Sequence, residues 1–238
     1  MQVAGKGERR TMSKRLDFYI ETRKDLIDAI NTFGFLPLFS NSIPGFSAEE
    51  HTAPQVLWGA EDGLWEWKGP AIQESGCAYG KFLMGKATFV SSEWFPDFAN
   101  VRRDGYDFDA RYDEGLAPHR EKVLFDLIDG HAPIISLQLK ELGGYGKGGV
   151  KGFDTTISRL QSQCYVLISN FTYRIGKRGQ RKGWGLAEYN TPERWLREAF
   201  SEHVYERDPA ESKALVLDHL HELLPNTRTD ALEKLLNH

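Results

Sequence analysis

The order of periodic segments in the second half of the chain does most to limit its possible folds. Three helical patterns precede two β-rich runs; in order, these segments are residues 118–129, 137–142, 154–163, 165–171 and 184–189. The β-rich runs flank a glycine-punctuated segment rich in Lys and Arg, which indicates a hairpin with a basic tip. This order predicts a winged helix-turn-helix, in which the third helix enters the DNA major groove and the hairpin tip contacts phosphates.

The first half of the chain predicts a mixture of helix and strand. Residues 22–33 place apolar side chains on one helical face, and Gly34 ends the pattern. Short β-branched or aromatic runs between glycines predict strands, with a hairpin turn at Met84-Gly85; these runs are residues 56–58, 65–67, 77–83 and 86–91. Residues 93–101 predict a short helix, and residues 102–113 predict a connector.

The C-terminal part predicts further helices. Two of them open with a capping residue followed by proline, at Thr191-Pro192 and Asp208-Pro209, and a last one covers residues 227–236. The chain as a whole is therefore predicted to be α+β with four parts. These are a flexible tail (1–17), an aromatic-rich α/β region (18–113), the winged helix-turn-helix (114–190) and C-terminal helices that pack across both (191–238).

The charge of the chain is unevenly distributed. The whole chain carries -4, but residues 140–183 hold nine Lys or Arg and two acidic residues, a net +7, so the remainder carries -11. A local positive patch on an acidic protein is typical of a surface that faces a polyanion, although a solvated loop without function would look the same.

The winged-helix interpretation assigns roles to polar residues of the third helix and of the hairpin. Arg159, Gln161 and Gln163 are expected to address bases from a face opposite the buried side chains. The predicted DNA-binding residues are Lys151, Ser158, Arg159, Arg174, Lys177, Arg178, Arg181 and Lys182. Winged helices also dock proteins, so a non-enzymatic protein–protein interaction module or a transcriptional regulator remains the alternative. Docking of a protein partner would be insensitive to salt, unlike DNA binding.

The aromatic half offers a second candidate site. Of the 29 aromatic residues, 12 fall within residues 56–112, where most of them supply apolar area for a small sheet. Lysines lie among them, and cations beside aromatic faces can hold an extruded base by stacking while pairing its phosphates. The candidate base pocket comprises Trp65, Trp67, Lys68, Tyr79, Lys81 and Lys86. A small-ligand enzyme with a deep pocket at Trp65, Trp67 and Tyr79 is a third possibility.

Two glycine patterns resemble nucleotide-binding motifs but lack their context. Residues 80–87 end in Ala87, where a P-loop needs Ser or Thr to reach magnesium, and a strand pattern follows instead of a helix. Residues 144–149 match the dinucleotide fingerprint but follow a helix. We therefore expect no nucleotide cofactor.

Metal sites, membrane spans and export are also not expected. His219 and His221 point in different directions on a helix, and Cys77 and Cys164 have no partner cysteines at ligand spacing. No run approaches the ~18 apolar residues that a membrane-spanning helix needs. With two cysteines and a basic, polar start without a secretory pattern, the chain is expected in the cytoplasm.

Four segments together resemble a known family. They are Trp65-Glu-Trp-Lys-Gly69, Tyr79-Gly-Lys-Phe-Leu-Met-Gly-Lys86, Phe89-Val-Ser-Ser-Glu-Trp-Phe-Pro96 and Ile157-Ser-Arg-Leu-Gln161. The combination is similar to bacterial proteins described as related to AlkZ, the winged-helix alkyl-DNA glycosylases, over roughly residues 20–200. The resemblance implies stacked winged helices around DNA and excision of alkylated or crosslinked bases.

The resemblance also implies where catalysis would occur, if the protein is an enzyme. In those glycosylases a Gln-aliphatic-Gln or Gln-aliphatic-Asp motif positions the hydrolytic water. The nearest string in this chain is Gln161-Ser162-Gln163, whose middle residue is polar. Gln161 and Gln163 are therefore the candidate catalytic pair of an N-glycosidic bond hydrolase, and the sequence leaves open whether any bond is broken. The implied partner is duplex DNA, damaged or not.

Overall fold

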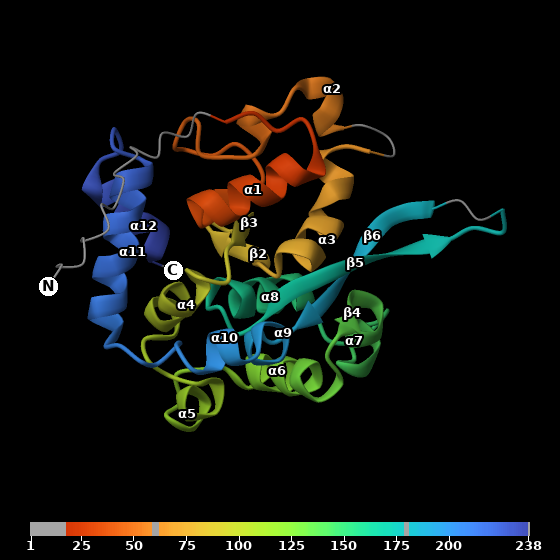
Figure 1. Cartoon of the computed structure of the whole chain (residues 1–238). Coiled ribbons are helices and arrows are strands. Elements are labelled where there is room, and N and C mark those ends of the chain that lie inside the picture. Colours follow the sequence, from red (N-terminus) through yellow and green to blue (C-terminus); the bar gives the residue numbers. More distant parts are fainter. Residues whose placement is uncertain (1–17, 59–61, 179–180, 238) are drawn as a thin grey trace, which may run out of the picture.

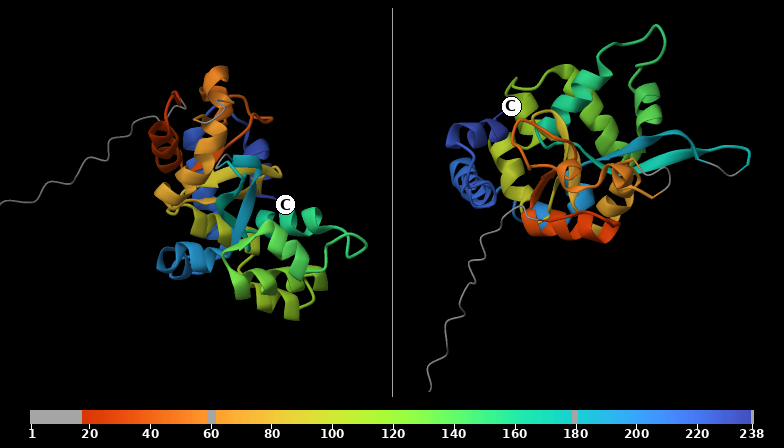
Figure 2. Two further views of the ribbon diagram at one scale, coloured as in Figure 1. Left: turned by 90° about the vertical axis from the view of Figure 1, so that its right-hand side faces the viewer. Right: turned by 90° about the horizontal axis from the view of Figure 1, so that it is seen from above.

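A computed structural model describes residues 18–58, 62–178 and 181–237, with only the backbone of Lys182 and Trp184. The predicted tail, residues 1–17, lies outside the described residues. The chain has an α+β fold with two three-stranded antiparallel sheets, ordered β1-β3-β2 and β4-β6-β5. Figures 1 and 2 show a long hairpin leaving the body of the molecule on the side opposite to the last two helices.

The first sheet is built around a capped helix and a tight turn. Helix α1 (Arg23–Phe33) begins with a capping box between Thr22 and Asp25, and Gly34 ends it with φ = 75°. A Cβ at Gly34 would meet the indole of Trp94, so close packing as well as backbone conformation requires glycine there. Strands β1 (Phe35–Pro37), β2 (Ala78–Leu83) and β3 (Lys86–Val90) follow. The predicted turn at residues 84–85 is confirmed, with positive φ at both.

Two predicted strands of the first half are wrong. Val56 and Leu57 belong to helix α2 (Pro54–Leu57), which ends before Trp58, and residues 65–67 belong to helix α3 (Leu64–Ser75). A 3₁₀ helix covers Glu49–His51. Helix α3 buries side chains three and four apart, among them Leu64, Lys68 and Ala71, which is a helical period that a three-residue aromatic run does not reveal. Tertiary packing has thus overridden the β propensity of the tryptophans.

The predicted connector 102–113 is also more structured than expected. Helix α4 (Phe95–Arg103) extends into it, and α5 (Phe108–Asp113) follows, capped by Asp107, whose carboxylate accepts from the Ala110 N–H at 2.8 Å. Arg102 and Arg103, the last two residues of α4, are buried. The guanidinium of Arg102 donates to the carbonyl oxygens of Phe82, Leu235 and Asn237 at 2.7–2.9 Å.

The second half has the predicted order of three helices and a hairpin. The elements are α6 (His119–His131), β4 (Ile134–Ile135), α7 (Ser136–Leu142), α8 (Phe153–Ser162), β5 (Leu167–Ile175) and β6 (Arg181–Asn190). Each of the first two helices is slightly longer than its predicted range: α6 includes Gly130, and Ser136 is the first residue of α7. The short strand β4 joins the hairpin as a third strand on β6.

Four helices complete the chain: α9 (Pro192–Leu196), α10 (Glu198–Ser201), α11 (Pro209–Leu223) and α12 (Thr229–Leu236). Thr191 and Asp208 directly precede α9 and α11, and proline is the first residue of each helix, as the capping pattern predicts. Among the described residues, no helix has the length and apolar character needed to cross a bilayer.

Apolar side chains form two clusters. One contains the β1-β3-β2 sheet, α1, α3, α4 and the C-terminal helices α10 to α12, and the other contains α5 to α8 and the β4-β6-β5 sheet. Ile168 of β5 packs against both clusters. Strand β5 therefore connects the two apolar clusters, and it also lies beside α3 and β2. The division into four parts stays a prediction.

Candidate nucleic-acid interface

The β5–β6 hairpin carries a group of exposed cations away from the body of the molecule (Figure 1). Arg174, Lys177, Arg178 and Arg181 are all exposed, and Arg174 pairs with Lys182 through the backbone of the ladder. The side chain of Lys182 lies outside what the structure describes. Cations at the end of a projecting hairpin can approach a polyanion without steric hindrance from the rest of the acidic surface.

Arg181 of the hairpin contacts the body of the molecule. Its guanidinium lies 2.8 Å from the Glu66 carboxylate of α3 and 4.5 Å from the ring centroid of Tyr173. Burial and a hydrogen bond to Glu66 raise the pKa of Tyr173 to about 12. This pair attaches the start of β6, next to the hairpin turn, to α3. The charge of Arg181 is therefore less available to a polyanion than that of an exposed cation without an acidic partner.

Helix α8 exposes less polar surface than the sequence predicts. Thr155 and Arg159 are exposed and Ser158 is half-buried, whereas Gln161 and Gln163 are only 2% and 5% exposed. The prediction that both glutamines address bases from the open face is wrong. The physical reason is that α8 packs against β2 of the first sheet as well as against α6, so two of its sides are covered.

Arg159 is exposed but already has an acidic partner. Its Nε lies 3.0 Å from the Oε1 of Glu121, a residue of α6 that is 3% exposed. Desolvation raises the pKa of Glu121, and the positive charges of Arg159 and Arg111 oppose that rise. A base contact by Arg159 would therefore compete with a half-buried ion pair.

Four of the six candidate base-pocket residues line one cavity of about 220 Å³ at the foot of the hairpin. The cavity lies between α3, β2, α8 and β5, and its walls are Phe39, Trp65, Lys68, Tyr79, Gly80, Lys81, Ala87, Asp154, Ile157, Gln161, Ile168, Phe171 and Tyr189. The structure thus brings Trp65, Lys68, Tyr79 and Lys81 together with Gln161. Sequence reasoning missed Phe39, Phe171 and Tyr189. The alternation of the β5 segment is the one signal that could have pointed to Phe171.

Lys68 differs from the other charged residues of this cavity because it is buried against aromatic rings. Its Nζ lies 3.6 Å from the ring centroid of Trp65 and 4.6 Å from that of Phe171, and it donates to the Trp65 carbonyl oxygen at 2.7 Å. The residue is 2% exposed, and burial lowers the pKa of its amine to about 8, against an opposing effect of Glu66. An amine in these surroundings is partly unprotonated near neutral pH.

Both ends of the Gln161 carboxamide are occupied. Its Oε1 accepts from the Lys81 backbone N–H at 3.1 Å, and its Nε2 donates to the Ile157 carbonyl oxygen at 3.2 Å. The Lys81 amine in turn donates to the Ser158 hydroxyl at 3.1 Å. Gln161 therefore connects β2 to α8 at the wall of the cavity. Gln163 lies two residues further on, directly after the end of α8, and its buried Oε1 has no hydrogen-bond partner within the described residues.

The remaining candidate residues lie elsewhere. Trp67 is buried, and its indole N–H donates to the carboxylate of Asp62. Lys86 is exposed and donates to the Ser40 carbonyl oxygen at 2.6 Å. Lys151 is exposed in the loop that precedes α8. Within the described part of the chain, no group of three or more His, Cys, Asp or Glu residues could hold a metal ion.

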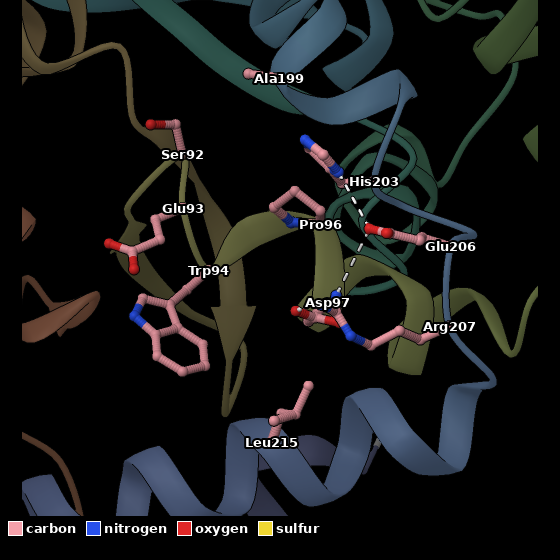
Figure 3. Close-up of a pocket in the computed structure, with 10 residues that line it drawn as sticks. All are labelled: Ser92, Glu93, Trp94, Pro96, Asp97, Ala199, His203, Glu206, Arg207 and Leu215. Carbon is pink, nitrogen blue, oxygen red and sulfur yellow. Dashed lines mark hydrogen bonds and ion pairs between the residues drawn. The ribbon is translucent and has the colours of Figure 1, made fainter. Parts of the chain in front are cut away.

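A second, larger hollow of about 850 Å³ lies between α4, α10 and α11 (Figure 3). Figure 3 shows Trp94 on one side and the charged side chains of Asp97, Glu206 and Arg207 on the other, with His203 beside them. Arg207 lies 3.3 Å from Asp97 and 4.0 Å from Glu206, and His203 lies 3.2 Å from Glu206. Arg207 and His203 are thus paired with acidic side chains of the hollow itself. The hairpin and its cavity therefore remain the candidate interface.

Comparison with known proteins agrees with the resemblance read from the sequence. A family model described as AlkZ related matches residues 20–237, further than the roughly 20–200 expected from sequence motifs. A search of curated proteins and a search of solved structures each gave no match. The family match covers nearly all of the chain, and on this basis the chain belongs to the AlkZ-related family.

Proposed function

We propose that this protein binds DNA, with residues 114–190 acting as a winged helix. In this proposal α8 is the recognition helix and the β5–β6 hairpin is the wing. The order of elements, the antiparallel pairing of β4, β6 and β5, and the family relation to alkyl-DNA glycosylases support it. Thr155, Ser158 and Arg159 on the exposed side of α8 face the groove, and Lys151 stands at the entrance to the helix.

The observation that carries the proposal is the projecting cationic hairpin on an anionic protein. Phosphate contacts by Lys and Arg release counterions, so the logarithm of affinity falls with the logarithm of salt concentration. With Arg174, Lys177, Arg178 and Lys182 on phosphates, about four contacts give a slope of roughly -3 to -4. Such contacts hold the duplex without reading its sequence.

The cavity at the foot of the hairpin suits an extruded base. Its volume of about 220 Å³ is below the roughly 300–1,000 Å³ typical of sites for drug-sized ligands. Trp65, Tyr79 and Phe171 offer aromatic walls, and extruded bases are held by stacking in enzymes that act on them. We therefore propose repair-type recognition of a damaged or unpaired base beside the bound duplex.

The binding test uses labelled duplex and bulged DNA with the full chain, measured by fluorescence anisotropy at low and moderate salt. The variant R174Q/K177Q/R178Q should bind at least about 10-fold more weakly at low salt, with a salt slope shallower by about 3. The matched control K24Q/R228Q/K234Q removes the same charge from exposed positions on α1, α12 and the residue before α12. Equal binding by the two variants contradicts the proposal.

The rival function, docking of a protein partner, predicts a different salt response. Association through apolar surface varies little with salt, whereas the exposed surface of the hairpin is rich in cations.

Measuring affinity for bulged against fully paired duplex separates base recognition from simple backbone binding. We expect bulged DNA to bind more tightly, because the cost of unstacking is smallest for an unpaired base.

A further inference from the structure

The cavity at the foot of the hairpin contains a nucleophile that DNA binding does not require. The Lys68 amine lies at the cavity wall between the rings of Trp65 and Phe171, and its hydrogen-bond acceptor is the Trp65 carbonyl oxygen at 2.7 Å. A lysine needed only for phosphate attraction would be exposed to solvent, as Lys177 of the hairpin is, and would not lie along an aromatic wall.

Glu66 is the acidic residue whose charge acts on Lys68, but its carboxylate pairs with a different residue. Glu66, on the same helix, places its carboxylate 2.8 Å from Arg181 and also forms a hydrogen bond with the Tyr173 hydroxyl. Its attraction for the amine is smaller than the effect of burial, and the pKa of Lys68 is lowered to about 8 as a result. Lysines activated for imine formation have this kind of surroundings: desolvated, in an apolar pocket and with a lowered pKa.

The second lysine of the cavity is in a different setting. The Lys81 side chain is exposed, and its amine donates to the Ser158 hydroxyl at 3.1 Å. Its place on the β2 side of the cavity makes it suited to a phosphate. Of the two lysines that line the cavity, Lys68 is therefore the one with the surroundings of a nucleophile.

We propose that Lys68 forms an imine with an aldehyde admitted to this cavity, and that the aldehyde is the ring-opened sugar of an abasic nucleotide. The assignment of the sugar rests on the proposed function, whereas the reactivity of the amine does not. An abasic nucleotide has lost its base, so its sugar fits where an extruded base would otherwise lie.

The chemistry balances without a further reactant. The lone pair of the unprotonated Lys68 nitrogen attacks the carbonyl carbon, and the carbonyl oxygen takes up the two protons that the amine nitrogen loses. One water molecule leaves, and a carbon–nitrogen double bond replaces the carbon–oxygen double bond. Water reverses the step, and the aromatic walls of the cavity limit its access. Added borohydride supplies a hydride that converts the imine to a stable secondary amine.

The first arm of the test uses no DNA. The full chain is treated with propanal and cyanoborohydride at pH 7.5, and alkylation of each lysine is followed by peptide mass spectrometry. Because a lowered pKa leaves more free amine, Lys68 should react on the order of 10-fold faster than the exposed Lys234. A Lys68 rate equal to or below that of Lys234 overturns the proposal.

The second arm uses an oligonucleotide with one abasic site and borohydride. A covalent protein–DNA adduct should form with the wild type and with the control Lys234→Met, and be lost in Lys68→Met and in Lys68→Arg. Lys68→Arg keeps the positive charge and cannot form a reducible imine, so it covers the case in which Lys68→Met does not fold. An adduct that persists in both Lys68 variants overturns the proposal.

Anisotropy with intact duplex in the same samples separates the two hypotheses. Normal duplex binding by a chain that gives no adduct leaves the proposed function standing and overturns the imine. Propanal labelling of Lys68 without duplex binding supports the reactive amine, overturns the abasic sugar as its ligand and contradicts the proposed function.

Discussion

The cations of the β5–β6 hairpin and the cations of the interior are the same residue types in opposite surroundings. Lys177 and Arg178 are exposed, whereas Lys68, Arg102 and Arg103 are 2%, 3% and 1% exposed. In the interior, backbone carbonyl oxygens, aromatic rings and an acidic partner replace the water that surrounds the hairpin cations. A sequence count of positive charge therefore does not measure how much of it is available to a ligand.

The difference also separates two roles for positive charge. An exposed cation contributes little to folding and is free to attract a polyanion. A buried one that donates several hydrogen bonds fixes the segments that surround it, and its removal leaves acceptors without partners. The following variants test this contrast, beginning with the cation whose surroundings are most enclosed.

Arg103→Met should have the largest effect on stability. The guanidinium of Arg103 donates to the Cys164 carbonyl oxygen at 2.8 Å, the Glu193 carboxylate at 2.7 Å and the Tyr205 hydroxyl at 2.9 Å. Its loss leaves the buried carbonyl unpaired, so the free energy of unfolding should fall by about 3 kcal/mol or more. Urea denaturation followed by circular dichroism measures this change.

The control for Arg103 is Arg174→Met in the hairpin. It removes the same side chain from an exposed position and should change the free energy of unfolding by less than about 0.5 kcal/mol. If the two variants were equally stable, burial would not distinguish the two groups of cations.

Lys68→Met should act in the opposite direction to Arg103→Met, because the amine of Lys68 is destabilised by burial. The folded state holds its pKa at about 8 against 10.5 in the unfolded chain, so below pH 8 the folded state carries the cost of a buried charge. That cost disappears as the pH rises from 8 to 10.5. Replacement by Met should therefore stabilise the protein by about 1–3 kcal/mol at pH 7.

The pH dependence distinguishes this effect from simple improvement of packing. The advantage of Lys68→Met over the wild type should shrink between pH 8 and pH 10.5, where the wild type itself gains stability. Thermal unfolding of both proteins across this range measures the difference. A difference in stability that stays constant with pH would show that the amine has the same pKa in the folded and the unfolded state.

Sequence reasoning succeeded where local patterns are strong. The helices at 119–131, 136–142 and 153–162 and the hairpin strands follow from periodicity and glycine positions that lie within each segment. It failed at Trp65 and Trp67, because three residues are too few to separate a strand from one turn of a helix. It also could not show that Gln161 is buried, since the covering strand β2 lies 80 residues away along the chain.

The buried cations illustrate the same limit. Arg102 and Arg103 lie at the start of a segment that the sequence presents as a polar connector, and their partners are 20 to 135 residues away. No local pattern encodes such contacts. By contrast, the grouping of Trp65, Lys68, Tyr79 and Lys81 was predictable, because lysines among closely spaced aromatic residues indicate a shared surface before the fold is known.

Arg159 stands between the two groups and gives the smallest predicted effect. Its side chain is 54% exposed, yet its Nε lies 3.0 Å from the carboxylate of the buried Glu121. Glu121→Gln removes that negative charge and releases the guanidinium toward the proposed DNA-binding face of α8. Duplex affinity should then rise about 2- to 5-fold, with a salt slope steeper by up to about 1, if Arg159 takes up a phosphate or base contact.

The cost of Glu121→Gln to the fold should be small. Burial raises the pKa of Glu121, so its ionised form is disfavoured in the folded state, and the stability that it contributes falls as the pH rises through that shifted pKa. At pH 7 a neutral amide avoids this penalty. Glu222→Gln, an exposed change of the same charge on α11, is the matched control and should leave DNA affinity within error of the wild type. An equal gain in both variants would mean that the change in overall charge strengthens binding, and not the release of Arg159. A gain confined to Glu121→Gln would show that Arg159 contributes to DNA affinity, as is proposed for the hairpin cations.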